Sequence, residues 1–186
     1  MSKTPDLPTP ALQVSHWFNT PGPLSLQNLR GRVVALHAFQ MLCPGCVAHG
    51  LPQATRMHEA FPPDQLAVVG LHSVFEHHEV MQPAAALQAF IHEYRLAFPI
   101  GIDQADPQGG AVPLTMRALG LRGTPSLLLI DKRGRIRLHQ FGRVDDLRVG
   151  ALIGQLIAEP VEDEAVRCDD DGWRLPEVVI VPHENM

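Results

Sequence analysis

The chain has 186 residues, of which 45% are apolar, and 15 Lys and Arg against 20 Asp and Glu give it a formal net charge of -5. This length and composition favour one well-filled core with extensions over two independent domains. The basic residues form no cluster, so the sequence excludes nucleic acid as an expected partner. We also expect no membrane segment and no signal peptide, because Pro, Asp, His and Asn interrupt residues 1–30 at short intervals.

The predicted elements alternate between strands and helices. Apolar, β-branched runs predict buried strands, and apolar residues spaced three or four apart predict amphipathic helices. An apolar strand and an alternating strand joined by the turn sequence DKRG predict a β-hairpin. In chain order we expect a strand at 31–39, a helix from 44 to about 61, strands at 66–73 and 99–103 flanking a helix at 84–98, a short helix at 113–120, the hairpin at 125–142, and a helix at 145–159.

Side-chain patterns predict which residues share one side of each element. In the second hairpin strand we expect Ile136, Leu138 and Gln140 on one side, and in the last helix Leu147, Leu152, Ile153 and Leu156 on one side. Alternating strands and helices followed by a hairpin predict an α/β fold, with a central mixed sheet covered on both faces.

The ends of the chain differ in composition from its middle. Residues 1–11 are rich in proline and predict a loose N-terminal arm, and residues 160–186 form an acidic C-terminal appendage for which we expect a small hairpin turning at 170–172. The domain itself is then expected at 12–159.

Three cysteines are too few for a disulfide scaffold, and two of them, Cys43 and Cys46, are two residues apart in FQMLCPGC. Because no targeting segment is expected, we predict a cytoplasmic protein, and in a reducing compartment such a pair is catalytic or metal-binding.

The position of the pair favours redox chemistry. Cys43 follows a buried strand and Pro44 suits the first position of a helix. Free backbone N–H groups and the helix dipole would there stabilise a Cys43 thiolate. Cys46 would lie one turn further on, close enough to form a disulfide and less exposed. This is the arrangement of an attacking and a resolving thiol.

A metal site is the alternative from a different class of protein, such as a copper-handling module. A structural zinc ion needs four ligands, which this cysteine pair does not supply by itself. The residues that could complete a site are Cys168, His49, His72, His77 and His78. The densest cluster, HSVFEHHE, fits a polar loop after a strand equally well, so we predict no metal.

Two longer stretches, PLSLQNLRGRVVALHAFQMLCPGC and GLRGTPSLLLIDKRGRIRLHQFG, resemble the thioredoxin-fold disulfide reductases of the TlpA and redoxin group, which are close to the peroxiredoxins. The resemblance covers about Leu12 to Ala158 and depends on the order of motifs: an LxLxxLRGR lead-in, Cys-x-x-Cys, a helical insertion, Gly123-Thr124-Pro125 and the hairpin. It implies a thioredoxin-like fold and thiol-disulfide exchange with no bound cofactor. The implied partners are a disulfide-containing protein or small molecule and a thiol or dithiol reductant.

The resemblance also implies roles for single residues. Pro125 would follow a cis peptide bond and face the cysteines, although a trans proline opening the next strand is the alternative. The backbone of Thr124 would offer an edge to an extended substrate. His37 stands six residues before Cys43, where thioredoxins carry a buried carboxylate that moves a proton to and from the second cysteine. An imidazole could do the same, or His37 could be a core histidine bonded to the backbone.

The sequence departs from the family pattern at several positions. Leu42 replaces the usual Trp, and Pro44-Gly45 reverses the usual order of the dipeptide. Pro52 stands one residue further from Cys46 than in the pattern, which predicts a bulge or kink in the helix.

A thiol peroxidase is the other alternative. Peroxiredoxins carry Thr or Ser three residues before the reactive cysteine and Pro seven before it. Aligning Cys46 with that cysteine places Cys43 and Phe39 in these positions, so both supporting residues are missing. The prediction is therefore a thiol-disulfide oxidoreductase in which Cys43 attacks and Cys46 releases the product.

Overall fold

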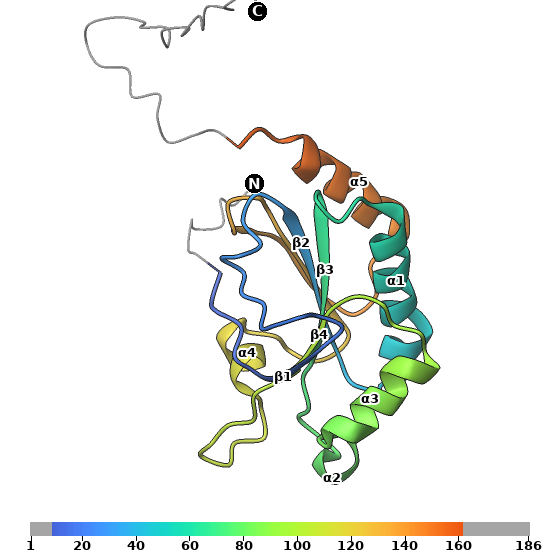
Figure 1. Cartoon of the computed structure of the whole chain (residues 1–186), viewed down its shortest axis with the longest axis vertical. Helices are drawn as coiled ribbons and strands as arrows, with labels where there is room; N and C mark the ends of the chain where they lie inside the picture. Colours follow the sequence, from blue (N-terminus) through green and yellow to red (C-terminus); the bar gives the residue numbers. More distant parts are fainter. Residues whose placement is uncertain (1–8, 162–186) are drawn as a thin grey trace, which may run out of the picture.

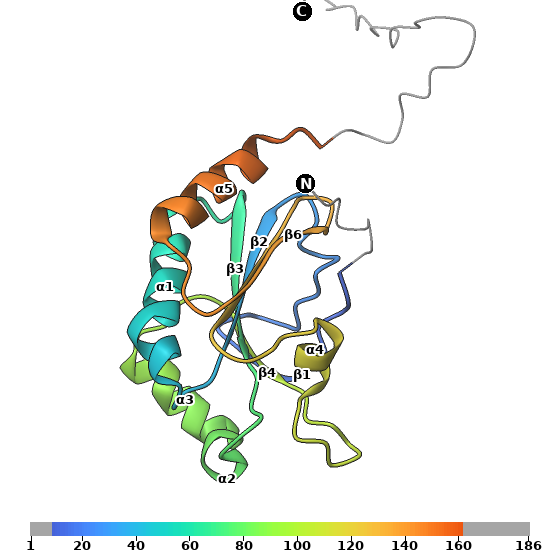
Figure 2. The same cartoon turned by 180° about the vertical axis from the view of Figure 1, so that it is seen from behind.

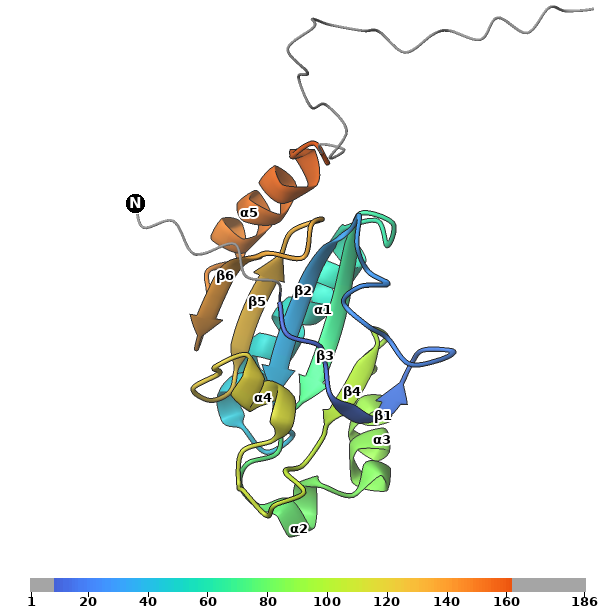
Figure 3. The ribbon, with the colours of Figure 1, turned by 90° about the vertical axis from the view of Figure 1, so that its left-hand side faces the viewer.

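In the computed structural model, which describes residues 9–161, six strands form one sheet in the order β1-β4-β3-β2-β5-β6 (Figure 3). Parallel pairing joins β2 to β3 and β3 to β4, while β1, β5 and β6 run antiparallel to their neighbours. The predicted mixed sheet with a C-terminal hairpin is thus confirmed. The strands are β1 (Val14–Phe18), β2 (Val33–Phe39), β3 (Leu66–His72), β4 (Ile100–Asp103), β5 (Ser126–Ile130) and β6 (Ile136–Phe141).

Helices cover both faces of this sheet (Figures 1 and 2). One core cluster, which includes Phe39, packs under α1, α3 and α5. The cluster on the other face includes Leu26 and Leu29 of the N-terminal segment and Met116 of α4. The helical elements are the π-helical turn η1 (Cys46–Gly50), α1 (Leu51–Ala60), α2 (His78–Met81), α3 (Ala84–Glu93), α4 (Leu114–Ala118) and α5 (Asp146–Ala158). Within residues 9–161, no helix combines the length and the apolar character needed to cross a membrane.

Two short elements were not predicted. Strand β1 is a partly buried edge strand, held by its antiparallel pairing with β4. Its five residues alone carry too weak a pattern to indicate a strand. Helix α2 forms in the stretch predicted as a polar loop, where His77 adopts a left-handed conformation just before it.

Two helix predictions were wrong in detail. Helix α3 ends at Glu93 and not at 98, because Arg95 adopts a positive φ of 51° that a right-handed helix does not allow. On α5, the side chain of Leu147 is 84% exposed. Val149, Ile153 and Leu156 are the buried residues of α5, and Leu147 is two positions from Val149, which places it on the opposite side of the helix.

The helix that follows the cysteines carries the predicted bulge. The N–H of Leu51 donates to the carbonyl oxygen of Cys46, five residues earlier, which defines the π-helical turn η1. Pro52 follows directly and has no N–H to donate to the preceding turn, which agrees with an irregular turn at this point of the helix. The extra residue of η1 matters for the site because it places Gly50 opposite the sheet.

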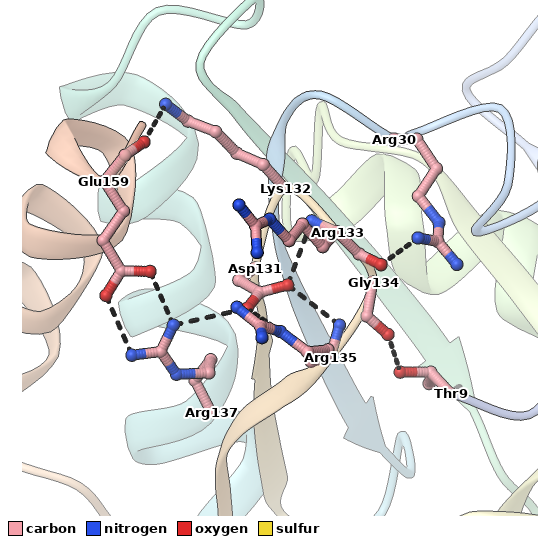
Figure 4. A network of polar contacts seen from close by, with 9 residues as sticks. All are labelled: Thr9, Arg30, Asp131, Lys132, Arg133, Gly134, Arg135, Arg137 and Glu159. Carbon is pink, nitrogen blue, oxygen red and sulfur yellow. Dashed lines mark hydrogen bonds and ion pairs between the residues drawn. The ribbon is translucent and has the colours of Figure 1, made fainter. Parts of the chain in front are cut away.

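Ionic contacts fix the β5–β6 turn at the end of β5 remote from Ser126 (Figure 4). The Asp131 carboxylate accepts hydrogen bonds from the backbone N–H of Arg135 at 2.9 Å and from its Nε at 2.8 Å. Arg137 forms a bidentate pair with Glu159 at 2.6 and 2.8 Å. The network ties the end of α5 to the hairpin. Cys168 and the hairpin predicted at 170–172 lie outside the described residues, as does most of the N-terminal arm.

Candidate active site

The two cysteines lie where the chain leaves β2 and turns into the helix. The N–H of Cys43 donates to the carbonyl oxygen of Gln40 at 3.3 Å, which closes the turn, and helical structure begins at Pro44. The backbone N–H of Cys46 donates to Cys43 Sγ at 3.3 Å. An N–H of the first helical turn therefore points at the Cys43 sulfur and stabilises negative charge on it. Cys43 is partly exposed, whereas Cys46 is fully buried.

The segment before β5 faces the cysteines. The peptide bond between Thr124 and Pro125 is cis, as the resemblance implied, which excludes the trans alternative. The Cys43 thiol donates to the carbonyl oxygen of Thr124 at 3.5 Å. Gly45 lies so close to Pro125 that a Cβ at Gly45 would be 3.3 Å from Pro125 Cδ. The backbone before Pro125 is thus positioned beside the sulfur of Cys43.

Cys46 is a much weaker acid than an ordinary thiol. Its pKa is raised to about 12, chiefly by burial and next by the hydrogen bond with Cys43, while hydrogen bonds with Gln40 and Thr124 oppose the rise and the negative charge of Cys43 adds a smaller contribution. Two of these causes depend on Cys43 being a free thiol. When the Cys43 sulfur is bound in a disulfide with a substrate, its charge is gone and Cys46 ionises more readily.

His37 lies inside the sheet face that η1 covers. Its side chain is 2% exposed, and neither ring nitrogen has a hydrogen-bond partner among the described residues. The backbone-bonded histidine considered above is therefore not what the structure contains. A Cβ on Gly50 would lie 2.5 Å from His37 Nε2, so only glycine leaves room for the imidazole there. Burial lowers the pKa of His37 to about 4, which keeps the ring neutral at pH 7.

A small pocket of about 50 Å³ opens beside His37. Gln53 partly closes it by donating to the carbonyl oxygen of Val144 at 2.9 Å and to Asp146 at 2.6 Å. Arg56 pairs with the same Asp146 carboxylate at 2.9 Å. The pocket is polar and large enough for a water molecule. It is lined by His37, Ala48, His49, Gly50, Gln53, Arg56, Pro125, Leu127, Gly142, Arg143, Val144 and Asp146.

Sequence reasoning missed Gln40. This buried side chain accepts from the N–H of Phe75 at 3.4 Å and its amide donates to Thr124 Oγ1 at 3.5 Å and to Glu76 at 3.4 Å. It therefore connects the loop after β3 with the segment before Pro125. A polar residue directly after a strand that is buried throughout was the available signal.

The histidines considered as metal ligands do not form one site. His72 is fully buried in β3 beside Phe39, with ring centroids 5.3 Å apart, and neither of its ring nitrogens has a hydrogen-bond partner in the described part of the chain. Among residues 9–161 no three His, Cys, Asp or Glu side chains lie close enough together to hold a metal ion.

Comparisons with known proteins agree with this geometry. A thioredoxin-like superfamily protein, SPOA0173, is 54% identical, with a TM-score of 0.79 over 82% of this chain and 97% of that one. A thiol-disulfide isomerase from Corynebacterium glutamicum is 49% identical, with a TM-score of 0.77 over 82% of this chain and 98% of that one.

A curated relative is more distant. The thiol-disulfide oxidoreductase ResA of Halalkalibacterium halodurans is 23% identical over 125 residues, which are 67% of this chain and 62% of the ResA sequence. The chain thus spans somewhat less than two thirds of that relative's length. The AhpC/TSA family matches residues 4–139, which is most of the chain. The chain therefore belongs to the AhpC/TSA family, with a thioredoxin-like fold and thiol-disulfide oxidoreductases among its homologues.

Proposed function

We propose that this protein is a thiol-disulfide oxidoreductase that acts on protein or small-molecule disulfides through Cys43 and Cys46. The observation that carries the proposal is the asymmetry of the pair. Cys43 is accessible, receives the N–H of Cys46 and lies 3.5 Å from the carbonyl oxygen before Pro125, while Cys46 is buried beneath it. An accessible nucleophile and a protected second thiol are what stepwise exchange requires.

The reaction proceeds in two exchanges. The Cys43 thiolate attacks one sulfur of the substrate disulfide, which forms a mixed disulfide and releases the other sulfur as a thiolate that takes up a proton. The Cys46 thiolate then attacks the Cys43 sulfur, which releases the second substrate thiolate and leaves a Cys43–Cys46 disulfide. Two electrons have passed to the substrate, and an external thiol or dithiol restores the protein pair.

Deprotonation of Cys46 is the demanding step, and we infer that His37 assists it by accepting the proton. Direct transfer from a thiol of pKa about 12 to an imidazole of pKa about 4 would be uphill by on the order of 11 kcal/mol. Two features reduce this difference. The mixed disulfide removes the Cys43 charge that raises the pKa of Cys46, and water in the adjoining pocket could solvate the imidazolium and carry the proton onward.

A Cys46→Ser variant tests the proposed function. It should accumulate a mixed disulfide with oxidised protein substrates, seen as a mass increase that dithiothreitol removes, whereas Cys43→Ser should form none. If Cys46→Ser formed no mixed disulfide and the wild type did not turn over disulfides, the proposal would be contradicted.

Neither alternative function gains support. A peroxidase that used Cys46 would need an accessible thiolate, and Cys46 is fully buried with a raised pKa. Metal content after purification, measured beside a free-thiol count before and after dithiothreitol, tests the metal-binding alternative. A cytoplasmic location stays a prediction, and cell fractionation tests it.

A further inference from the structure

The surface beside Cys43 has features that the exchange chemistry does not need. Leu42, which precedes the nucleophile, is 57% exposed, and Phe141, at the end of the edge strand β6, is 45% exposed. Phe141 pairs with Ser126, the residue that follows Pro125, so this ring lies at the same end of the sheet as the cysteines. Both side chains therefore lie at the end of the sheet where a substrate of Cys43 would bind.

Phe141 also positions a charge. Its ring packs against the backbone of Gly123, where a Cβ would lie 2.8 Å from Phe141 Cε2. The guanidinium carbon of Arg122 lies 5.8 Å from the centroid of the same ring. Within residues 9–161 no carboxylate lies within ion-pair distance of Arg122. The ring thus holds an exposed cation in place without neutralising it.

The adjoining backbone is open to a partner. The N–H of Thr124 has no hydrogen-bond partner in the described part of the chain, and its carbonyl oxygen receives the Cys43 thiol. Once a substrate sulfur is bonded to Cys43, that thiol hydrogen is gone and the carbonyl is free to accept from the substrate backbone. An extended segment can therefore pair along Thr124.

We propose that Arg122 and Phe141 form a recognition subsite that selects protein substrates with an acidic side chain two residues from the cysteine under attack. The inference rests on the proposed function, because it concerns the substrate of the same thiols. Arg122 stands two residues before Thr124, a separation of at most roughly 7 Å along an extended chain. Because the chain bends at residues 123–125, Arg122 lies within this limit, and a substrate whose cysteine lies at Thr124 brings a side chain two positions away within reach of the Arg122 guanidinium.

The charge and the ring act on different parts of this side chain. The guanidinium can bind a carboxylate through two parallel hydrogen bonds. The exposed part of the Phe141 ring, together with Leu42, receives apolar portions of the substrate backbone and side chains. An ion pair at a partly exposed site changes affinity by up to about fivefold, so that exchanging an acidic for a basic side chain changes it by about tenfold.

The test compares disulfide-linked peptides that differ only in Glu or Lys at the second position before or after one cysteine. We expect the wild type to reduce one of the Glu peptides with a kcat/KM about tenfold above that of its Lys counterpart at low salt, with the ratio falling as salt is added. Arg122→Glu should invert this ratio, and Phe141→Leu should weaken it. Arg32→Glu, directly before β2, changes the net charge equally at the end of that strand remote from the cysteines and should keep the wild-type ratio.

The outcomes separate the subsite from the proposed function. A wild type that reduces hydroxyethyl disulfide but shows no preference between Glu and Lys peptides overturns the subsite alone, as does a ratio that Arg122→Glu leaves unchanged. An equal change of the ratio in Arg32→Glu would assign the preference to overall charge and also overturn it. A wild type that reduces neither the peptides nor hydroxyethyl disulfide overturns both proposals.

Discussion

Alkylation rates of the two cysteines provide the most direct test of the assigned roles. At pH 8, a thiol of pKa about 12 is ionised to about one part in 10⁴, against roughly one part in ten at the unperturbed value near 9. Cys46 should therefore react with iodoacetamide at least about a thousandfold more slowly in the folded protein than in the unfolded chain. Burial of its sulfur adds to this difference. Cys43, partly exposed and supplied with an N–H donor, should be the thiol that reacts.

The assay follows both cysteines in one reduced sample. Timed alkylation at pH 7 and 8, acid quenching and peptide mass spectrometry give two rate constants, and the urea-unfolded chain supplies the intrinsic rates. We expect Cys43 to be labelled at least about a hundredfold faster than Cys46. Equal rates, or earlier labelling of Cys46, would refute Cys43 as the nucleophile and reopen the peroxidase alternative.

The same experiment tests the coupling between the two thiols. Part of the rise in the Cys46 pKa comes from the hydrogen bond and charge of Cys43. In a Cys43→Ser variant the charge is absent while the burial remains, so Cys46 should be alkylated faster than in the wild type. If its rate stayed the same, substrate attachment at Cys43 could not prepare Cys46 for the second exchange.

Three further predictions concern the surroundings of the pair. Pro125→Ala should lower kcat/KM for protein disulfides about tenfold or more but that for a small disulfide far less, because only the larger substrate pairs with the backbone; an equal loss for both would show that the proline holds the cysteines in place. His37→Ala should slow the resolving exchange about 10- to 100-fold with Cys43 alkylation nearly unchanged. Because the pKa of His37 is about 4, its contribution should persist at neutral pH and fall below about pH 5, and superimposable single-turnover pH profiles would exclude the relay. Burial also lowers the pKa of His72 from 6.5 to about 4, so His72 binds a proton more tightly in the unfolded chain than in the folded protein. Its protonation should therefore lower the free energy of unfolding by about 2 kcal/mol between pH 7 and pH 5. Urea unfolding should show that His72→Leu abolishes this part of the loss while the exposed His92→Gln does not; identical pH dependence in His72→Leu would contradict the assignment.

The sequence by itself determined the class of fold and the chemistry. Long apolar runs define β2, β3 and β5 because a strand buried on both faces needs apolar residues at nearly every position. The Cys43-x-x-Cys46 spacing defined the redox pair because a helix start brings these two positions together. Even the bulge at η1 was visible, since Pro52 stood one residue out of place.

Tertiary structure decided what short-range patterns do not encode. Strand β1 exists only because β4 offers it an edge, and α3 ends where the backbone at Arg95 turns. The missing partners of His37 and the steric role of Gly50 depend on the packing of η1 against β2, between residues that are 13 positions apart in the chain. The contact of Arg122 with Phe141 likewise arises from the pairing of β5 with β6. A sequence reports the local preferences of a residue, whereas its unmet hydrogen bonds, raised or lowered pKa and distant neighbours are properties of the folded surroundings.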